Sequence, residues 1–169
     1  MEPQLTIQEG IYYLRSVIIG RNVGLGGMYA TRGKFGEPIQ TAALVPSTFE
    51  HRDWKIARAG NDTFYIEYAQ KYPPGGGRTG FCNTATEDGT PILLDRPKEF
   101  TIQPVGDGLL FSEDAYIIRP HRPEMLDGVD ICVGVQGREL VIKTVPVDAP
   151  LESRPTWYFS RRHDLETAS

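Results

Sequence analysis

The side chains that could do chemistry in this 169-residue chain are few and scattered. Its three histidines, His51, His121 and His163, have no cysteine or carboxylate beside them at metal-ligand spacing, so we predict no metal site. Its two cysteines, Cys82 and Cys132, lack the flanking motifs of a catalytic thiol. We therefore interpret both cysteines as free thiols that pack in the interior, not as nucleophiles.

Two glycine-rich segments suggest nucleotide binding, but their context excludes it. Residues 75–80 (GGGRTG) lack the Gly-Lys-Ser/Thr ending of a phosphate-binding loop, and no helical pattern follows them. Residues 24–27 (GLGG) continue into a strand-like run, where a dinucleotide-binding fold needs a helix. No enzyme motif remains, so we expect neither catalysis nor a bound cofactor.

Composition and charge exclude further classes of function. The formal net charge of −4 offers no basic surface to neutralise phosphates, so we expect no nucleic-acid partner. Residues 1–9 have neither the basic flank nor the apolar run of a signal peptide, and no stretch approaches the roughly 20 apolar residues of a membrane span. We expect no membrane association and a cytoplasmic location.

A short pattern recurs along the chain, in which a turn residue precedes an aromatic and an aliphatic side chain two positions apart. It starts at residues 10 (GIYYL), 62 (DTFYI) and 114 (DAYII), so the interval is 52 residues each time. Side chains two apart point to the same face of a strand, so each copy predicts a strand with one buried face. Similar runs close each unit at residues 54–56, 100–102 and 157–159, and apolar pairs lie midway at 38–39, 91–92 and 140–141.

Three units with roughly four short strands each predict twelve strands. Twelve strands in three pseudo-symmetric units of about 50 residues predict an all-β fold, the β-trefoil. Eighteen glycines and thirteen prolines interrupt the chain, and no long window has the helical period of 3.6 residues. We expect one domain over residues 1–169, with units near 9–60, 61–112 and 113–162 and a short flexible C-terminal tail; a β-sandwich is the alternative.

On a closed barrel, function belongs to the loops, because the strands are occupied with packing. Residues 21–27 form a glycine-rich loop whose main chain can approach a partner closely. Residues 45–51 (VPSTFEH) combine a stiffening proline with one aromatic anchor, and in a trefoil they would neighbour the first loop. Residues 69–80 form a third loop that is long enough to project. Turn formation alone is the alternative explanation for each glycine-rich loop.

Several short motifs, in their order, carry a resemblance to a known family. They are residues 9–17 (EGIYYLRSV), 26–31 (GGMYAT), 97–100 (PKEF), 115–119 (AYIIR), 135–137 (VQG), 147–148 (VD) and 154–157 (RPTW). Together they resemble the mycocypins, mushroom cysteine protease inhibitors that include clitocypin-like and macrocypin-like members, and the clitocypin-like members more. The resemblance implies a defensive β-trefoil that binds papain-like cysteine proteases reversibly and competitively, with two neighbouring loops in the active-site cleft.

The resemblance also implies which residues contact the protease. Gly26 and Gly27 match the glycine pair that approaches the catalytic cysteine, and a segment without side chains fills a narrow cleft without presenting a normal scissile bond. We expect a monomer that buries an interface of about 1,600 Å². The full set of expected protease-binding residues is Val23, Gly24, Leu25, Gly26, Gly27, Met28, Pro46, Ser47, Thr48, Phe49, Glu50 and His51.

The third loop departs from the family pattern. Some mycocypins carry an asparagine there that legumain reads, whereas residues 69–80 contain none and have Lys71 and Tyr72 at that point. Legumain is therefore a doubtful target. Lys71 or Arg78 could instead enter the acidic primary pocket of a trypsin-like serine protease, which makes that second activity a hypothesis.

Two other classes of trefoil are the alternatives. A carbohydrate-binding lectin would repeat Gln-x-Trp strands, and this sequence has none; its closing aromatics are better explained as core residues. Kunitz-type inhibitors share the architecture but generally rely on disulfides that two cysteines cannot match with certainty.

Overall fold

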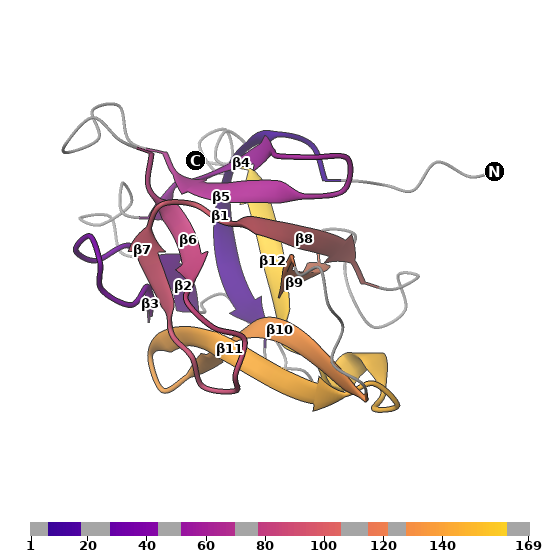
Figure 1. The fold of residues 1–169 in the computed structure, drawn as a ribbon. Coiled ribbons are helices and arrows are strands. Elements are labelled where there is room, and N and C mark those ends of the chain that lie inside the picture. Colours follow the sequence, from indigo (N-terminus) through magenta and orange to yellow (C-terminus); the bar gives the residue numbers. More distant parts are fainter. Residues whose placement is uncertain are drawn as a thin grey trace.

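The computed structural model describes residues 7–17, 28–43, 52–69, 78–105, 115–121 and 128–161 (Figure 1). Within these ranges no helix has the length and apolar character needed to cross a membrane. A 3-10 turn, Leu151–Ser153, precedes the last strand. The strands are β1 (Gly10–Val17), β2 (Met28–Thr31), β3 (Gln40–Ala43), β4 (Trp54–Arg58), β5 (Phe64–Tyr68), β6 (Gly80–Asn83), β7 (Ile92–Asp95), β8 (Glu99–Pro104), β9 (Ala115–Pro120), β10 (Val129–Gln136), β11 (Glu139–Pro146) and β12 (Thr156–Arg161).

Six of the strands close into a barrel. All neighbours are antiparallel, in the order β1–β4–β5–β8–β9–β12 and back to β1. The closing pair, β1 with β12, runs in register from Tyr12 opposite Arg161 to Val17 opposite Thr156. A closed barrel has no free edge strand, which removes the usual template for aggregation. The alternative of an open β-sandwich is thereby excluded.

The other six strands form three hairpins, β2–β3, β6–β7 and β10–β11, which hydrogen-bond to one another in a triangle. Ile39 N–H donates to Ile92 O at 2.8 Å, Gly89 N–H donates to Ile142 O at 2.8 Å, and Leu140 N–H donates to Ile39 O at 2.9 Å. Each hairpin thus bonds to both others. A six-stranded barrel with three mutually bonded hairpins is a β-trefoil, as the repeat predicted.

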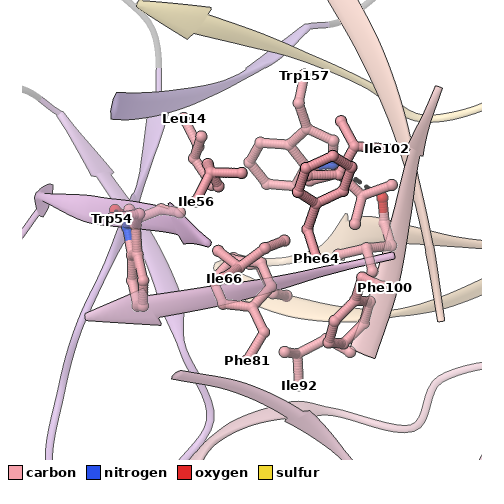
Figure 2. Packing of buried hydrophobic residues seen from close by; sticks show 14 of the residues in the cluster. Leu14, Trp54, Ile56, Phe64, Ile66, Phe81, Ile92, Phe100, Ile102 and Trp157 are labelled. Atoms are coloured by element: carbon pink, nitrogen blue, oxygen red, sulfur yellow. Dashed lines mark hydrogen bonds between the residues drawn. The ribbon is translucent and has the colours of Figure 1, made fainter. Parts of the chain in front are cut away.

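The repeated pattern places equivalent residues in one core. Leu14, Ile66 and Ile118 lie 52 residues apart, and all three are fully buried. The aromatics of the closing strands, Trp54, Phe100 and Trp157, are also buried, which confirms their interpretation as core residues; Figure 2 shows Trp54, Phe100 and Trp157 among the packed side chains.

Two of the three units add the same hydrogen bond to this packing. The indole Nε1 of Trp54 donates to Ala30 O at 2.9 Å, and that of Trp157 donates to Val133 O at 2.9 Å. The partner lies 24 residues earlier in both cases. Phe100 occupies the equivalent place in the middle unit, where its ring has no N–H to donate.

The apolar pairs at residues 38–39, 91–92 and 140–141 lie at the third strand of each unit, but the two prolines precede their strands. Pro38 and Pro91 form only single bridges, to Leu93 and Val141, and the continuous ladders begin after them. Proline cannot donate a ladder hydrogen bond, so it precedes the strand. The exact unit boundaries remain a prediction, and the proposed C-terminal tail lies outside the described residues.

Candidate functional site

The two expected inhibitory loops leave the fold at one edge. Residues 18–27 connect β1 to β2, and residues 44–51 follow the end of β3. Met28, the first residue of β2, is the register partner of Ala43, the last residue of β3. Ser16 of β1 also donates its hydroxyl to Met28 O at 3.3 Å. The backbone positions at which residues 18–27 end and residues 44–51 begin are therefore adjacent; the placement of the loops themselves stays a prediction.

Most of the expected contact residues lie outside the described part of the chain. Met28 is the exception in the first two loops, and its side chain is 37% exposed. Arg78 is the described member of the third loop's expected set. The expected residues outside the described ranges are Val23, Gly24, Leu25, Gly26, Gly27, Pro46, Ser47, Thr48, Phe49, Glu50, His51, Lys71 and Tyr72.

A buried arginine ties the two ends of the second loop together. Arg52, immediately after residue 51, is 1% exposed, and its Nη2 donates to the carbonyl of Ala43, immediately before residue 44. Burial lowers the pKa of Arg52. Beneath this edge the rings of Tyr13 and Tyr29 meet edge to face with centroids 6.4 Å apart. The sequence analysis did not predict a role for Arg52. The one hint in the sequence was its position just before the strand that begins at Trp54.

The third loop is anchored on β5. Glu67 and Gly80 are register partners, and Tyr68 N–H donates to Thr79 O at 2.8 Å. The guanidinium of Arg78 forms an ion pair with Glu67 and lies 4.7 Å from the centroid of the Tyr65 ring. Arg78 is thus held against β5 by its charge and by its ring contact.

A second ionic cluster lies in the last unit. Asp130 accepts two hydrogen bonds from Arg119, both at 2.8 Å, and one from Arg154 Nε at 2.6 Å. Burial raises the pKa of Asp130, but the hydrogen bonds from the two arginines outweigh it and bring the pKa down to about 2. Arg154 also donates to Ala149 O at 3.0 Å, so the cluster fixes the chain before β12.

The two cysteines are free and buried. Burial raises the pKa of Cys82, and burial raises that of Cys132 to about 11, so neither thiol has the low pKa of a nucleophile. Among the residues that the structure describes, no three histidine, cysteine, aspartate or glutamate side chains gather as a metal site would require. These findings fit the interpretation of both cysteines as packing residues.

Two solved structures resemble this fold at low sequence identity. The ricin B-like lectin of Macrolepiota procera, solved in complex with lactose, is 16% identical with a TM-score of 0.57 and covers 92% of this chain and 99% of its own. The designed 3-fold symmetric protein ThreeFoil is 11% identical with a TM-score of 0.54 and covers 89% of this chain and 98% of its own. At these identities the likeness concerns the fold, which is again the β-trefoil.

The sequence matches inhibitors much more closely. A sequence model of the family described as peptidase inhibitor clitocypin matches residues 10–159. Clitocypin-2 of Clitocybe nebularis is 35% identical over 157 residues, which are 92% of this chain and 98% of that protein. Clitocypin-4/-3 of the same organism is 34% identical with the same coverage. The chain therefore belongs to the clitocypin family of peptidase inhibitors and is not an enzyme.

Proposed function

We propose that this protein inhibits papain-like cysteine proteases, reversibly and competitively, with the loops at residues 21–27 and 45–51 inserted in the active-site cleft. Membership of the clitocypin family supports protease inhibition in general. The observation that supports this pair of loops is the shared edge at which they depart, where Met28 pairs with Ala43. Two loops that start from paired residues can act together on one cleft.

The rigidity of that edge supports tight binding. β2 is hydrogen-bonded to the buried indole of Trp54 through Ala30, and the buried Arg52 holds Ala43. A preorganised β2–β3 edge reduces the conformational entropy that the two loops lose when they dock. Gly26 and Gly27 would then fill the narrowest part of the cleft with main chain alone, as a monomer and without a covalent step.

Bulky substitution of the glycine pair tests the proposal. We expect Gly26→Trp and Gly27→Trp to raise the papain inhibition constant at least a hundredfold, because an indole cannot enter the space that main chain is to occupy. The matched control is Gly33→Trp, since Gly33 is an exposed glycine of the β2–β3 connection, at the opposite end of the hairpin from Met28 and Ala43. Steady-state titration of active-site-calibrated papain measures all three.

Thermal unfolding completes that experiment. The three variants should melt within a few degrees of the parent, because exposed loop substitutions usually change stability by less than about 0.5 kcal/mol. Undiminished papain inhibition by both Gly26→Trp and Gly27→Trp would exclude this loop as the docking element.

The hypothesis of a second activity on a trypsin-like protease now depends mainly on Lys71. Arg78 would first have to break its ion pair with Glu67 and leave the ring of Tyr65. We therefore expect that any trypsin inhibition is lost in Lys71→Ala and retained in Arg78→Ala, with papain inhibition unaltered in both. Retained trypsin inhibition in Lys71→Ala would contradict this assignment. Legumain, which would need an asparagine in residues 69–80, is not proposed as a target.

The lectin alternative finds no support in the aromatic residues of the closing strands. Trp54, Phe100 and Trp157 are at most 1% exposed and so cannot stack on a sugar ring. A glycan array decides the matter directly, and specific binding to any glycan would revive carbohydrate recognition.

A further inference from the structure

A pocket of about 570 Å³ lies between the β10–β11 hairpin, the segment 153–157 and the adjoining ends of β1 and β2. This volume is in the range of small-ligand sites. Its apolar lining consists of Met28, Val135, Val145, Pro155 and Trp157. Apart from Met28, these residues have no part in the proposed protease contact, so the pocket needs its own explanation.

The walls of the pocket are held in place without a ligand. Trp157 is 1% exposed, and its Nε1 donates to Val133 O at 2.9 Å. Arg154 fixes the neighbouring segment through Asp130. A Cβ on Gly134 would lie 2.7 Å from Lys143 Cγ and 2.8 Å from Pro155 Cγ, so only glycine lets these side chains pack over β10. A preformed pocket costs little ordering entropy when it is filled.

The hydroxyl groups of the lining direct their hydrogens away from a ligand. Ser16 donates to Met28 O at 3.3 Å, Thr41 to Arg138 O at 3.4 Å and Thr156 to Arg154 O at 3.2 Å. Thr144 donates its hydroxyl to Asp88 at 3.2 Å. These hydroxyls therefore contribute acceptor oxygens, and the donor for an anionic ligand must come from elsewhere.

Two cationic side chains line the pocket, and they differ in how far they are engaged. Arg154 is committed to Asp130 and to backbone carbonyls, and it is 7% exposed. Lys143 is half-buried, and its ammonium has three N–H donors, of which one points to Gln136 Oε1 at 3.4 Å. Asp88 is the facing carboxylate; hydrogen bonds from the N–H and hydroxyl of Thr144 lower its pKa, and the charge of Lys143 adds to that effect. Lys143 is thus the group that can receive an anion.

We propose that this pocket binds a small amphipathic anion, namely an unbranched alkyl chain that carries one carboxylate. The alkyl chain lies against Val135, Val145 and Pro155, and the carboxylate accepts hydrogen bonds from Lys143. The apolar contact supplies most of the affinity because affinity rises with each methylene that is buried. The charge-assisted hydrogen bond sets the orientation of the ligand.

Calorimetric titration of the purified chain with sodium decanoate tests the proposal in the absence of any protease, so the result does not depend on the inhibitory function. We expect saturable binding of one decanoate per chain and no detectable binding of butyrate, which has the same head group but too short a chain. Lys143→Gln should weaken decanoate binding about fivefold. Lys55→Gln, at an exposed lysine of β4, is the matched control and should bind like the parent.

A filling variant provides the second arm. Val135→Phe should weaken decanoate binding at least tenfold, because its ring takes up part of the pocket, while circular dichroism and the melting temperature verify the fold. Absence of saturable binding would overturn the proposal. Binding that is equal in the parent, Lys143→Gln and Val135→Phe would overturn it as well, because such binding would be surface adsorption.

Discussion

At the scale of single residues, Asp130 shows how burial and pairing compete. Its side chain is 15% exposed, and removal from water alone would favour the neutral carboxyl group. Hydrogen bonds from Arg119 and Arg154 reverse that preference and lower the pKa to about 2. An unfolded aspartate has a pKa of about 3.9, so the charged form of Asp130 stabilises the folded state.

Asp130→Asn should reduce the free energy of unfolding at pH 7 by about 2–4 kcal/mol, because the buried Arg154 and the partly buried Arg119 lose their counter-charge. The parent should lose the Asp130 contribution, about 2 kcal/mol, as the pH falls from about 5 toward 2 and the folded carboxylate becomes protonated. Urea unfolding at several pH values measures both effects. Asp148→Asn, at an exposed aspartate, is the control. An equal pH dependence in Asp130→Asn and the parent would contradict this account.

At the scale of elements, the end of the third loop is fixed where the backbone of β6 closely approaches that of β5. Gly80 starts β6 opposite Glu67 of β5, and a Cβ there would overlap the carbonyl oxygen of Ile66 and lie 2.9 Å from Glu67 Cα. The obstacle is backbone, which cannot move aside as a flexible side chain can. Only glycine permits this pairing, so the residue that ends the third loop is fixed by packing and not by the loop's own flexibility.

Gly80→Ala should therefore be strongly destabilising, by roughly 3 kcal/mol, as in other overpacked sites. Gly10→Ala is the matched control, since Gly10 also begins a strand but its Cβ would meet the Tyr12 ring at an ordinary 3.5 Å. Chemical denaturation of both variants gives the comparison. Similar stability of the two variants would show that β5 and β6 separate without cost.

The sequence was sufficient to predict the elements but not their lateral contacts. Strands were predictable because the buried pair two residues apart repeats every 52 residues, as at Leu14, Ile66 and Ile118. Two contacts could not be predicted: the hydrogen bond from Arg52 to Ala43 and the ion pair of Arg78 with Glu67. Both depend on which strands become neighbours. The pocket beside Lys143 likewise combines residues of three separate segments. The departure of two loops from one edge was anticipated, because it follows from the trefoil topology itself.

At the scale of the whole molecule, both thiols are buried on hairpin strands, Cys82 on β6 and Cys132 on β10. Cys82 is 7% exposed and Cys132 is fully buried, and neither is linked to another residue by a disulfide. The fold is therefore held by packing and by the strand ladders. Because both thiols are buried, we expect access to them to require opening of the fold around β6 and β10.

Thiol labelling can report that opening. With Ellman's reagent at pH 8, the native protein should react very slowly, because burial raises both thiol pKa values and blocks the reagent. In concentrated guanidinium chloride both cysteines of the chain should react at once. Rapid labelling of one thiol under native conditions would reveal a locally opening segment in place of a single cooperative unit.

The pairing of β1 with β12 joins residues 10–17 to residues 156–161, almost the full length of the described chain. During synthesis β1 emerges well before β12 and must wait for it before the two strands can pair. Contacts between such distant segments form slowly, because a long stretch of chain has to be ordered before they can be made. The nascent chain consequently cannot complete its barrel until β12 has emerged, whereas the pairing of Met28 with Ala43 is local to one hairpin. Until then β1 and β9 lack the neighbour that each has in β12, so we expect the incomplete chain to expose strand edges on which another chain can pair.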